Sequence, residues 1–549
     1  MSNNRRKTNF IVQGTILAGA SIIVRIIGLL YRIPLTNILG DEGMGYYSFA
    51  FEPYSVMLLL SYYGLPTAVS KLVATRNGEG KYKNSYRVFQ AGMMLTFIIG
   101  IITASFTFFG ADFIAGTLNS QPMSALALKV LGPTLFVLSI MGILRGYFQG
   151  MGTMIPTAIS QIIEQIVNAI VSIVAALYLF SYGSKVDSVL STESYAEAYG
   201  AAGGTFGTLM GAVAGLLFLI LVFAAYKSLL RRQIRRDRTR IKESYSDITK
   251  LLLITAAPIV LSSVIFNIGT TLDGAIFSNI LSKKEGYTSE TIASLWGIFT
   301  NKYKVLTTLP IAISTALSVA IVPNFSETMA SGNKGRLVSK VHYAVRFAML
   351  VAIPSAVGIS VLAEPIISLL FTEYSMIDVN LLRYGTLSVV AYSLSTITNA
   401  ILQGINQMRL PVIHAIISLL AHLFILVLLI GVFNTGIYGV TAAYILFAVF
   451  ICILNARSIT KHLSYKQEII RTFLLPTLSS VIMGIGVYAV YTVLHSFTKS
   501  NILSTMVSVS VGIIIYVVLL LLFKCVQEDD LYSVPKGDKI VSIARKLHL

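Results

Sequence analysis

Two arginines inside a long apolar stretch constrain this chain more than any other feature of its sequence. Residues 21–40, SIIVRIIGLLYRIPLTNILG, form a helix candidate that carries Arg25 and Arg32 far from either end. A charged side chain at the centre of a bilayer costs about 2.5–3.5 kcal/mol, so a helix with two of them does not face lipid on all sides. Seven residues are nearly two helical turns, which places both arginines on one face, about 10 Å apart. We therefore expect that face to line a wet or anionic cavity built by the rest of the chain.

The composition is that of an integral membrane protein. Hydrophobic residues make up 55% of the 549 residues and charged residues only 12%, about half the usual share in soluble domains. Apolar runs of about 18 residues or more recur along the chain, which favours helices over the short alternating strands of a barrel. We predict an all-α polytopic membrane protein with about 14 transmembrane helices. The predicted spans are 10–38, 45–74, 88–113, 125–150, 155–182, 203–227, 248–281, 292–324, 337–371, 380–404, 411–431, 436–456, 469–494 and 501–524.

The formal net charge of +18 does not indicate nucleic-acid binding, because the basic residues gather in alternate loops. The basic segments are 5–7, 71–87, 227–250, 334–346, 457–471 and 524–546. This positive-inside pattern predicts a plasma-membrane protein with both termini in the cytoplasm. The segment 227–250 is either an amphipathic helix on the anionic inner leaflet or a solvated loop that sets orientation.

Pairs of similar segments indicate an internal repeat of six helices. Residues 144–156, LRGYFQGMGTMIP, and 399–411, NAILQGINQMRLP, each place Gln-Gly at a helix end and a proline at the start of the next span. Residues 64–80 also resemble 320–335, and 21–39 align with 262–280, which sets Arg32 opposite Asp273. We predict two pseudo-symmetric six-helix lobes around a central cavity. The predicted domains are 1–236 (helices 1–6), 237–460 (helices 7–12) and 461–549 (helices 13 and 14 with a cytoplasmic tail).

Glycines recur every four residues in the sixth predicted span. Gly203, Gly207, Gly211 and Gly215 form a small-residue ladder. Such ladders allow two helices to approach closely, so we predict a packing role rather than a binding role.

The first span (VRIIGLLYRIPLTNILG), the eighth span (LTTLPIAISTALSVAIVPNFS) and the two helices beyond a twelve-helix core resemble the multidrug/oligosaccharidyl-lipid/polysaccharide (MOP) exporter superfamily. More specifically, the full length resembles MurJ-type lipid II flippases in their Gram-positive, SpoVB-like polysaccharide biosynthesis branch. The resemblance implies a transporter rather than an enzyme. It would flip a polyprenyl-diphosphate-linked cell-wall precursor, lipid II first of all, from the inner to the outer leaflet by alternating access. It also implies cavity arginines that bind the diphosphate, and a groove for the polyprenyl tail along the last two helices.

Arg25 and Arg32 match the arginines of the family's first helix. Guanidinium groups bind phosphate oxygens bidentately, which makes both arginines candidate substrate contacts. The alternative is that they only pair with acids such as Glu52 or Asp273. Glu52 is itself a departure, because related proteins have a basic residue in the second span, and we include it among the candidate substrate-binding residues.

Lys302 and Lys304 lie close to the position of the family's basic residue in the eighth helix. Two residues turn a helix by about 200°, so only one of these lysines faces the cavity. We choose Lys304, which shares a face with Thr308, and expect Lys302 to snorkel outward.

Acidic residues within the predicted spans are either gating or ion-coupling sites or counter-charges for basic residues. The candidates for gating or ion coupling are Asp273, Glu164 and Glu364. Asp273 is the first choice, with the hypothesis that an Arg32–Asp273 contact breaks when phosphate competes. Arg145 is interpreted as an ordinary positive-inside residue near the inner mouth of the cavity.

The sequence contains no GxxxxGK[ST] nucleotide-binding loop, and we expect no cofactor and no metal site. His414 and His422 are expected to form hydrogen bonds between helices. A coupling cation (Na+ or H+), the membrane potential or consumption of the product would then drive transport. The expected partners are lipid II or a related undecaprenyl-diphosphate glycan, membrane lipids and cell-wall synthases.

Three rival functions remain open at this point. One is a flippase for another lipid-linked polysaccharide unit, and another is a cation-coupled multidrug exporter of the same superfamily. An exporter of cationic drugs would need an acidic cavity, which the arginines oppose. The third is a membrane scaffold for cell-wall synthases.

Overall fold

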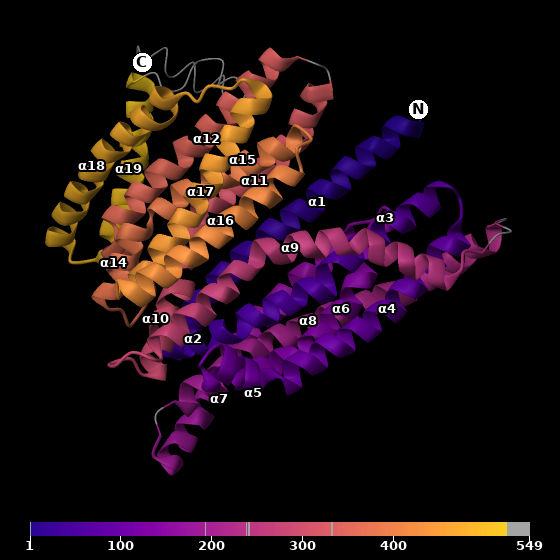
Figure 1. Cartoon of the computed structure of the whole chain (residues 1–549), viewed down its shortest axis with the longest axis horizontal. Helices are drawn as coiled ribbons and strands as arrows, with labels where there is room; N and C mark the ends of the chain where they lie inside the picture. The colour runs from indigo at the N-terminus through magenta and orange to yellow at the C-terminus, as the bar shows by residue number, and fades with distance from the viewer. Residues whose placement is uncertain (1, 193, 238, 240–241, 331–332, 524–549) are drawn as a thin grey trace. The chain divides into compact units, whose positions relative to one another are not determined.

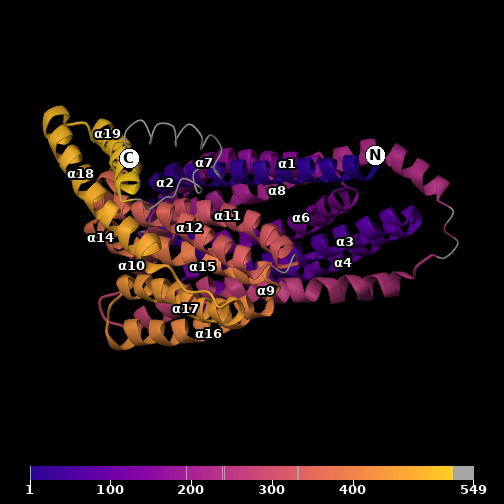
Figure 2. The same cartoon turned by 90° about the horizontal axis from the view of Figure 1, so that it is seen from above.

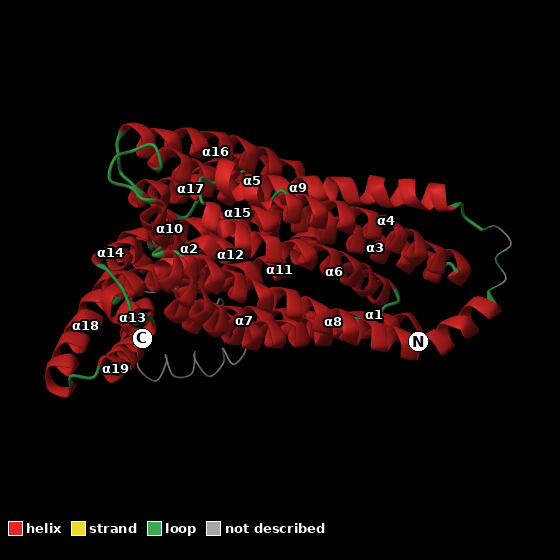
Figure 3. Ribbon diagram, turned by 90° about the horizontal axis from the view of Figure 1, so that it is seen from below, coloured by secondary structure: helices red, strands yellow, loops and turns green. Residues whose placement is uncertain are grey.

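The computed structural model describes residues 2–523 except 193, 238, 240–241 and 331–332. Helices and loops account for all the residues described, and no strand occurs among them (Figure 3). The predicted all-α fold is therefore confirmed. The basic segment 524–546 lies outside the described residues.

The chain divides into two compact units, Met1–Asn301 and Lys302–Leu549. Figure 1 labels their helices in chain order. The first unit holds α1 (Ser2–Leu30), α2 (Arg32–Leu58), η1 (Leu59–Tyr63), α3 (Gly64–Gly78), α4 (Tyr82–Phe109), α5 (Ala111–Phe113), η2 (Ile114–Leu118), η3 (Pro122–Ser124), α6 (Ala125–Gly150), α7 (Ile155–Leu190), α8 (Tyr195–Arg236), α9 (Tyr245–Leu281), α10 (Ser289–Gly297) and most of η4 (Ile298–Tyr303). The second holds α11 (Lys304–Ala330), α12 (Lys334–Val361), α13 (Ala363–Leu370), α14 (Met376–Gly385), α15 (Leu387–Gly404), α16 (Arg409–Val427), η5 (Leu428–Val432), α17 (Ile437–Leu463), η6 (Ile470–Leu474), α18 (Leu475–Thr498) and α19 (Asn501–Leu522). The predicted domain boundaries at 236/237 and 460/461 stay predictions.

Among the described residues, eleven helices are long and apolar enough to cross a membrane, or twelve if the bent pair α14 and α15 forms one span. The predicted span 10–38 covers most of α1 and the start of α2, and the predicted span 248–281 lies on α9; α1 and α9 are not among the eleven. In α1 the shorter segment Gly19–Leu30 is apolar. The multi-pass architecture is confirmed, but the predicted number of 14 spans is not.

The first predicted span continues beyond α1 and ends inside α2. The Tyr31 amide donates to the Ile27 carbonyl (3.1 Å) and the Leu35 amide to the Tyr31 carbonyl (3.2 Å), so helical hydrogen bonding continues across the junction. Gly40 then has φ 65° and ψ −177°, a conformation that favours glycine because it has no Cβ. This residue separates α2 into two helices, and the second of them begins a new span.

The glycine ladder of α8 brings its backbone against α7. A Cβ added at Gly203 would lie 2.5 Å from the Ala175 carbonyl oxygen, and one at Gly207 would lie 2.4 Å from the Ser172 nitrogen. These distances leave no room for any side chain, and α7 and α8 pack along much of their length. The predicted packing role of the ladder is confirmed.

The Gln-Gly motifs form similar helix contacts in the two units. At the end of α6, a Cβ on Gly150 would lie 2.7 Å from the Val73 Cβ of α3. At the end of α15, a Cβ on Gly404 would lie 2.6 Å from the Phe325 Cβ of α11. The Ser326 hydroxyl also donates to the Gly404 carbonyl (3.1 Å). Each unit thus joins two of its helices through a glycine at the repeated position, as the internal repeat predicts.

The last two helices form a hairpin that packs on α12 (Figure 2). Leu362, Met483, Val487 and Tyr516 are buried together at its base. The Tyr516 hydroxyl donates to the Leu350 carbonyl of α12 (2.9 Å). The outer faces of α18 and α19 stay apolar and exposed, as at Ile485, Ile513 and other residues.

Replacing Gly207 with alanine should destabilise the first unit, because the new methyl group would overlap the α7 backbone at Ser172. Overpacking of this kind costs about 1–3 kcal/mol. We expect Gly207→Ala to lower the thermal unfolding midpoint of the purified protein by several degrees. Gly19→Ala is the control, since nothing lies within 4 Å of its added Cβ. Equal midpoints for the two variants would contradict the packing role.

Candidate substrate-binding site

Arg25 and Arg32 lie in different surroundings although they share one helical stretch. Arg25, on α1, is exposed, and no residue in the described part of the chain forms an ion pair with it. Tyr63 is close enough to Arg25 to interact with it electrostatically. Arg32 begins α2, is half-buried and interacts with the phenol groups of Tyr31 and Tyr47. Of the two arginines, Arg25 has the more accessible charge.

Arg145 is the centre of a buried polar network that joins η1, α6 and α7. Its side chain is 5% exposed, and Nη2 lies 2.7 Å from Oε2 of Glu164. Nη1 donates to the Tyr62 hydroxyl (2.7 Å) and Nε to the Ser160 hydroxyl (2.9 Å). Each nitrogen of the guanidinium therefore has a hydrogen-bond partner, and its charge is balanced by Glu164. The interpretation of Arg145 as an ordinary positive-inside residue is wrong, because its side chain is buried and paired with Glu164. The sequence does not identify these partners, because they lie on neighbouring helices.

The π-helical segment η1 connects this network to Arg25. It carries two successive tyrosines, Tyr62 facing Arg145 and Tyr63, which is 50% exposed. Tyr63 interacts electrostatically with both Glu164 and Arg25. The Glu164 side chain is 26% exposed, so it is accessible as well as paired. Arg25, Tyr63 and Glu164 form the candidate site of the first unit, at one of the π-bulges that often mark functional positions.

Glu52 and Asp273 lie where α2 meets α9. Asp273 is 3% exposed. A Cβ on its neighbour Gly274 would lie 2.7 Å from Oε2 of Glu52, and the Thr271 hydroxyl donates to the Glu52 carbonyl (3.2 Å). Both acids interact with other groups. Acids on facing helices can share a proton or a cation. The predicted gating role of Asp273, its contact with Arg32 and the predicted substrate contact of Glu52 stay predictions.

Lys302 is buried in an ion pair inside the second unit. Its Nζ lies 2.8 Å from Oδ1 of Asp378, with side chains that are 2% and 0% exposed. The Nζ also donates to the Glu373 carbonyl (2.9 Å) and lies 5.3 Å from the centre of the Phe371 ring. Asp378 is held in place by a capping box with Ser375. The expectation that Lys302 snorkels outward is wrong, because Asp378 in the first turn of α14 supplies a buried counter-charge.

Lys304 is the more accessible of the two lysines. It is half-buried at the start of α11, with Nζ 5.1 Å from the ring centre of Tyr444. The ring of Tyr392 stacks on the ring of Tyr444, with 4.4 Å between the ring centres. The ring face stabilises the ammonium group by a cation–π interaction. Lys304 therefore stays the candidate substrate contact of the second unit.

The remaining polar residues of the sequence analysis are Glu364, His414 and His422. Glu364 is exposed in the first turn of α13. His414 Nδ1 lies 2.7 Å from Oδ1 of Asn455, and His422 Nδ1 lies 2.9 Å from the Ala443 carbonyl oxygen. Both histidines thus form the interhelical hydrogen bonds that were predicted.

The structure brings together some of the predicted site residues and separates others. Arg25 and Glu164 share a neighbour in Tyr63, and Glu52 lies beside the helix of Asp273. Sequence reasoning missed Tyr62 and Tyr63. The available signal was the Tyr-Tyr pair that follows the apolar run 56–60.

The sequence matches two protein families. Residues 11–329, more than half of the chain, match the family described as "Polysaccharide biosynthesis protein". Residues 294–428 match the MatE family.

Similar proteins of known sequence or structure match nearly the whole chain. The lipid II flippase MurJ of Bacillus subtilis (strain 168) is 26% identical over 504 residues, which are 89% of each protein. Stage V sporulation protein B of the same organism is 24% identical over 530 residues, 96% of this chain and 98% of that protein. A solved structure of a lipid II flippase MurJ in an inward closed conformation aligns with a TM-score of 0.67 at 17% identity. It covers 93% of this chain and 98% of the flippase, so the fold is shared.

Replacing Glu164 with glutamine should leave the buried Arg145 without its counter-charge. Loss of a hydrogen bond to a charged group in this setting costs about 2 kcal/mol. We expect Glu164→Gln to unfold several degrees below the wild type in a thermal scan. Glu364→Gln removes the same charge from an exposed position and should unfold with the wild type. Wild-type behaviour of Glu164→Gln would show that the ion pair is not needed for stability.

Replacing Lys302 or Lys304 with methionine should show which of the two charges is needed for stability. Lys302→Met leaves Asp378 buried and unpaired, at a cost of about 3–5 kcal/mol. Lys304→Met removes only a partly accessible charge and should change stability much less. The double variant Lys302→Met/Asp378→Leu should recover much of the loss, since it removes both buried charges. Thermal unfolding of the three variants measures this order, and a milder effect of Lys302→Met than of Lys304→Met would reverse the assignment.

Proposed function

The chain belongs to the polysaccharide biosynthesis protein family of the MOP superfamily, and we propose that it moves a polyprenyl-diphosphate-linked glycan precursor across the plasma membrane. It acts as a transporter and not as an enzyme. The most specific form of the proposal is export of lipid II from the inner to the outer leaflet. The named relatives support this substrate, since two of the matches above are lipid II flippases.

The observation that carries the proposal is the uncompensated charge of Arg25. The two most buried cations of the apolar helices, Arg145 and Lys302, are each neutralised by a carboxylate. Arg25 is exposed, and among the described residues no acid pairs with it. A helix retains such a charge in an apolar setting when an anion is bound there during function. A diphosphate fits, because each phosphate offers oxygens to the planar guanidinium.

The remaining parts of the substrate need surfaces of other kinds. The polyprenyl tail stays in the lipid, and the apolar outer faces of α18 and α19 provide a route for it. The head group enters from the cytoplasm and meets Arg25, with Lys304 as the candidate contact in the second unit. Alternating access then exposes the head group on the outside.

An inside-negative membrane potential favours this direction. Outward movement of one negative charge gains about 2.3 kcal/mol per 100 mV, so a net export of anionic charge needs no ATPase. Coupling to Na+ or H+ is the second source of energy in the proposal, with Asp273, Glu52 and Glu164 as candidate sites. Both termini are placed in the cytoplasm, following the distribution of basic loops.

A second candidate function is cation-coupled export of multidrug substrates. The match of residues 294–428 to the MatE family favours it. Cationic drugs would need uncompensated acids, whereas in the candidate site Glu164 is paired and the exposed charge without an ion-pair partner among the described residues is Arg25. The same protein in proteoliposomes separates the two functions, because one requires lipid II movement and the other dye transport against an ion gradient.

Reconstitution with labelled lipid II tests the proposed function. We expect wild-type proteoliposomes to expose the labelled head group in the opposite leaflet, and Arg25→Ala to slow this at least about tenfold. Arg25→Lys should retain part of the rate, because it keeps the charge but not the bidentate geometry. Arg336→Ala, which removes an exposed arginine in the first turn of α12, is the control and should transport like the wild type.

Two results would contradict the proposal. Normal transport by Arg25→Ala would remove its main support. Failure of the wild type to move lipid II, with movement of another polyprenyl-diphosphate glycan, would keep the flippase and change the substrate. Gradient-driven transport of cationic dyes alone would instead establish the multidrug function.

A further inference from the structure

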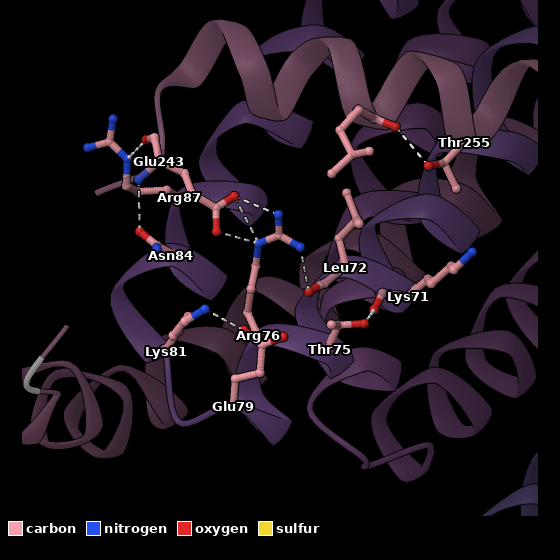
Figure 4. A network of polar contacts seen from close by, with 11 residues as sticks. Lys71, Leu72, Thr75, Arg76, Glu79, Lys81, Asn84, Arg87, Glu243 and Thr255 are labelled. Atoms are coloured by element: carbon pink, nitrogen blue, oxygen red, sulfur yellow. Dashed lines mark hydrogen bonds and ion pairs between the residues drawn. The ribbon is translucent and has the colours of Figure 1, made fainter. Parts of the chain in front are cut away.

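The segment that leads into α9 is fastened to α3 and α4 by its one glutamate. Glu243 accepts hydrogen bonds from Arg76 at both carboxylate oxygens, from Nε to Oε1 (3.0 Å) and from Nη2 to Oε2 (2.5 Å) (Figure 4). The Glu243 carbonyl accepts from Arg87 Nε (2.8 Å), and its amide donates to Oδ1 of Asn84 (3.2 Å). The Arg87 guanidinium lies 4.0 Å from the ring centre of Tyr245, the first residue of α9. Both carboxylate oxygens of Glu243 are thus hydrogen-bonded to Arg76, although its side chain is 30% exposed.

Asp237, directly after α8, is also turned inward. Its carboxylate accepts from the backbone amides of Lys83 (2.6 Å) and Thr239 (2.7 Å). Burial disfavours the charged carboxylate, but these hydrogen bonds outweigh it and hold the pKa of Asp237 below its usual range. The carboxylate is thus ionised and bound at neutral pH, and it does not neutralise the arginines that precede it.

Those preceding basic residues point outward. Lys227, Arg231, Arg232 and Arg235 on the last turns of α8 are all exposed, and no acid among the described residues forms an ion pair with them. We call these four residues the basic end of α8. Lys227, Arg231 and Arg235 recur every four residues, which puts like charges next to one another on one face of the helix. Such a row weakens a helix unless an anion lies against it.

We propose that the basic end of α8 is a docking surface for the headgroups of anionic phospholipids in the cytoplasmic leaflet. The carboxylates of Asp237 and Glu243 accept hydrogen bonds from α3 and α4, and the four charged side chains described along the basic end of α8 are all cationic. The basic residues begin immediately after the apolar part of α8, which ends near Tyr226. They therefore lie at the depth of the lipid phosphates rather than far out in solution.

The surroundings of the basic end of α8 favour a lipid over a soluble anion. Leu229, between the basic residues, is 45% exposed, whereas its neighbour Leu230 is 4% exposed and packs in the core. An exposed leucine beside basic side chains suits a membrane interface, where it contacts acyl chains while the cations contact phosphates. Of the segment 227–250, residues 227–236 extend α8 and residues 245–250 begin α9, and its contact with the inner leaflet stays a prediction.

Lipid binding by the purified full-length protein tests the proposal. Delipidated protein is titrated with phosphatidylglycerol or phosphatidylcholine, and bound lipid is counted by native mass spectrometry. Each basic residue near an anionic headgroup strengthens binding about fivefold. We expect Arg231→Gln/Arg232→Gln/Arg235→Gln to weaken phosphatidylglycerol binding more than about tenfold and to leave phosphatidylcholine binding unchanged.

Two matched variants keep the test falsifiable. Arg457→Gln/Lys461→Gln/Lys466→Gln removes the same charge from exposed residues at the end of α17 and just beyond it, and should bind phosphatidylglycerol almost like the wild type. Arg231→Lys/Arg232→Lys/Arg235→Lys keeps the charge and should keep most of the selectivity even if the glutamine variant folds poorly. Equal losses in the α8 and α17 glutamine variants would overturn the proposal, since any basic surface would then suffice. Displacement of the lipid by soluble pyrophosphate would overturn it too, by assigning the site to a free phosphate ion.

Discussion

The need to balance charge in an apolar environment governs the interior of both units. Arg145 and Lys302 have almost no exposed surface, and each is held by a carboxylate with further hydrogen bonds. An unpaired charge in such a place costs several kcal/mol, so these partners are conditions for folding. Arg25 differs because its charge is exposed and lies beside Tyr63. Buried cations paired with a carboxylate thus stabilise the fold, whereas the exposed cation Arg25 marks the candidate site.

Close helix contacts supply the rest of the scaffold. Without a hydrophobic driving force between helices in lipid, packing depends on small residues that let backbones meet. Gly203 and Gly207 do this between α7 and α8, and Gly150 and Gly404 do it at the repeated helix ends. The polar networks then have fixed surroundings, because the helices that carry Arg145 and Glu164 are held at defined distances.

Features with a local sequence signature were predictable. The glycine ladder, the Gln-Gly repeat and the all-helical membrane fold follow from spacing and composition, and the structure confirms them. The surroundings of Arg145 and Lys302 were not predictable, because their partners belong to other helices and loops. The sequence identifies Arg25 as unusual for its position in an apolar helix, but only the structure shows that Glu164 is already paired. Tyr62 and Tyr63 were missed because the same span holds another tyrosine pair, Tyr46 and Tyr47, so a tyrosine pair is a weak signal there.

The matching glycines at the ends of α6 and α15 have a consequence for how the two halves can be studied. Both glycines meet a β-carbon of the neighbouring helix at nearly the same distance. Because the same helix contact occurs in both halves, each contact serves as the internal control for the other. The same alanine substitution can be made at Gly150 and at Gly404, and a difference in outcome then reports on what each half does rather than on the chemistry of the change.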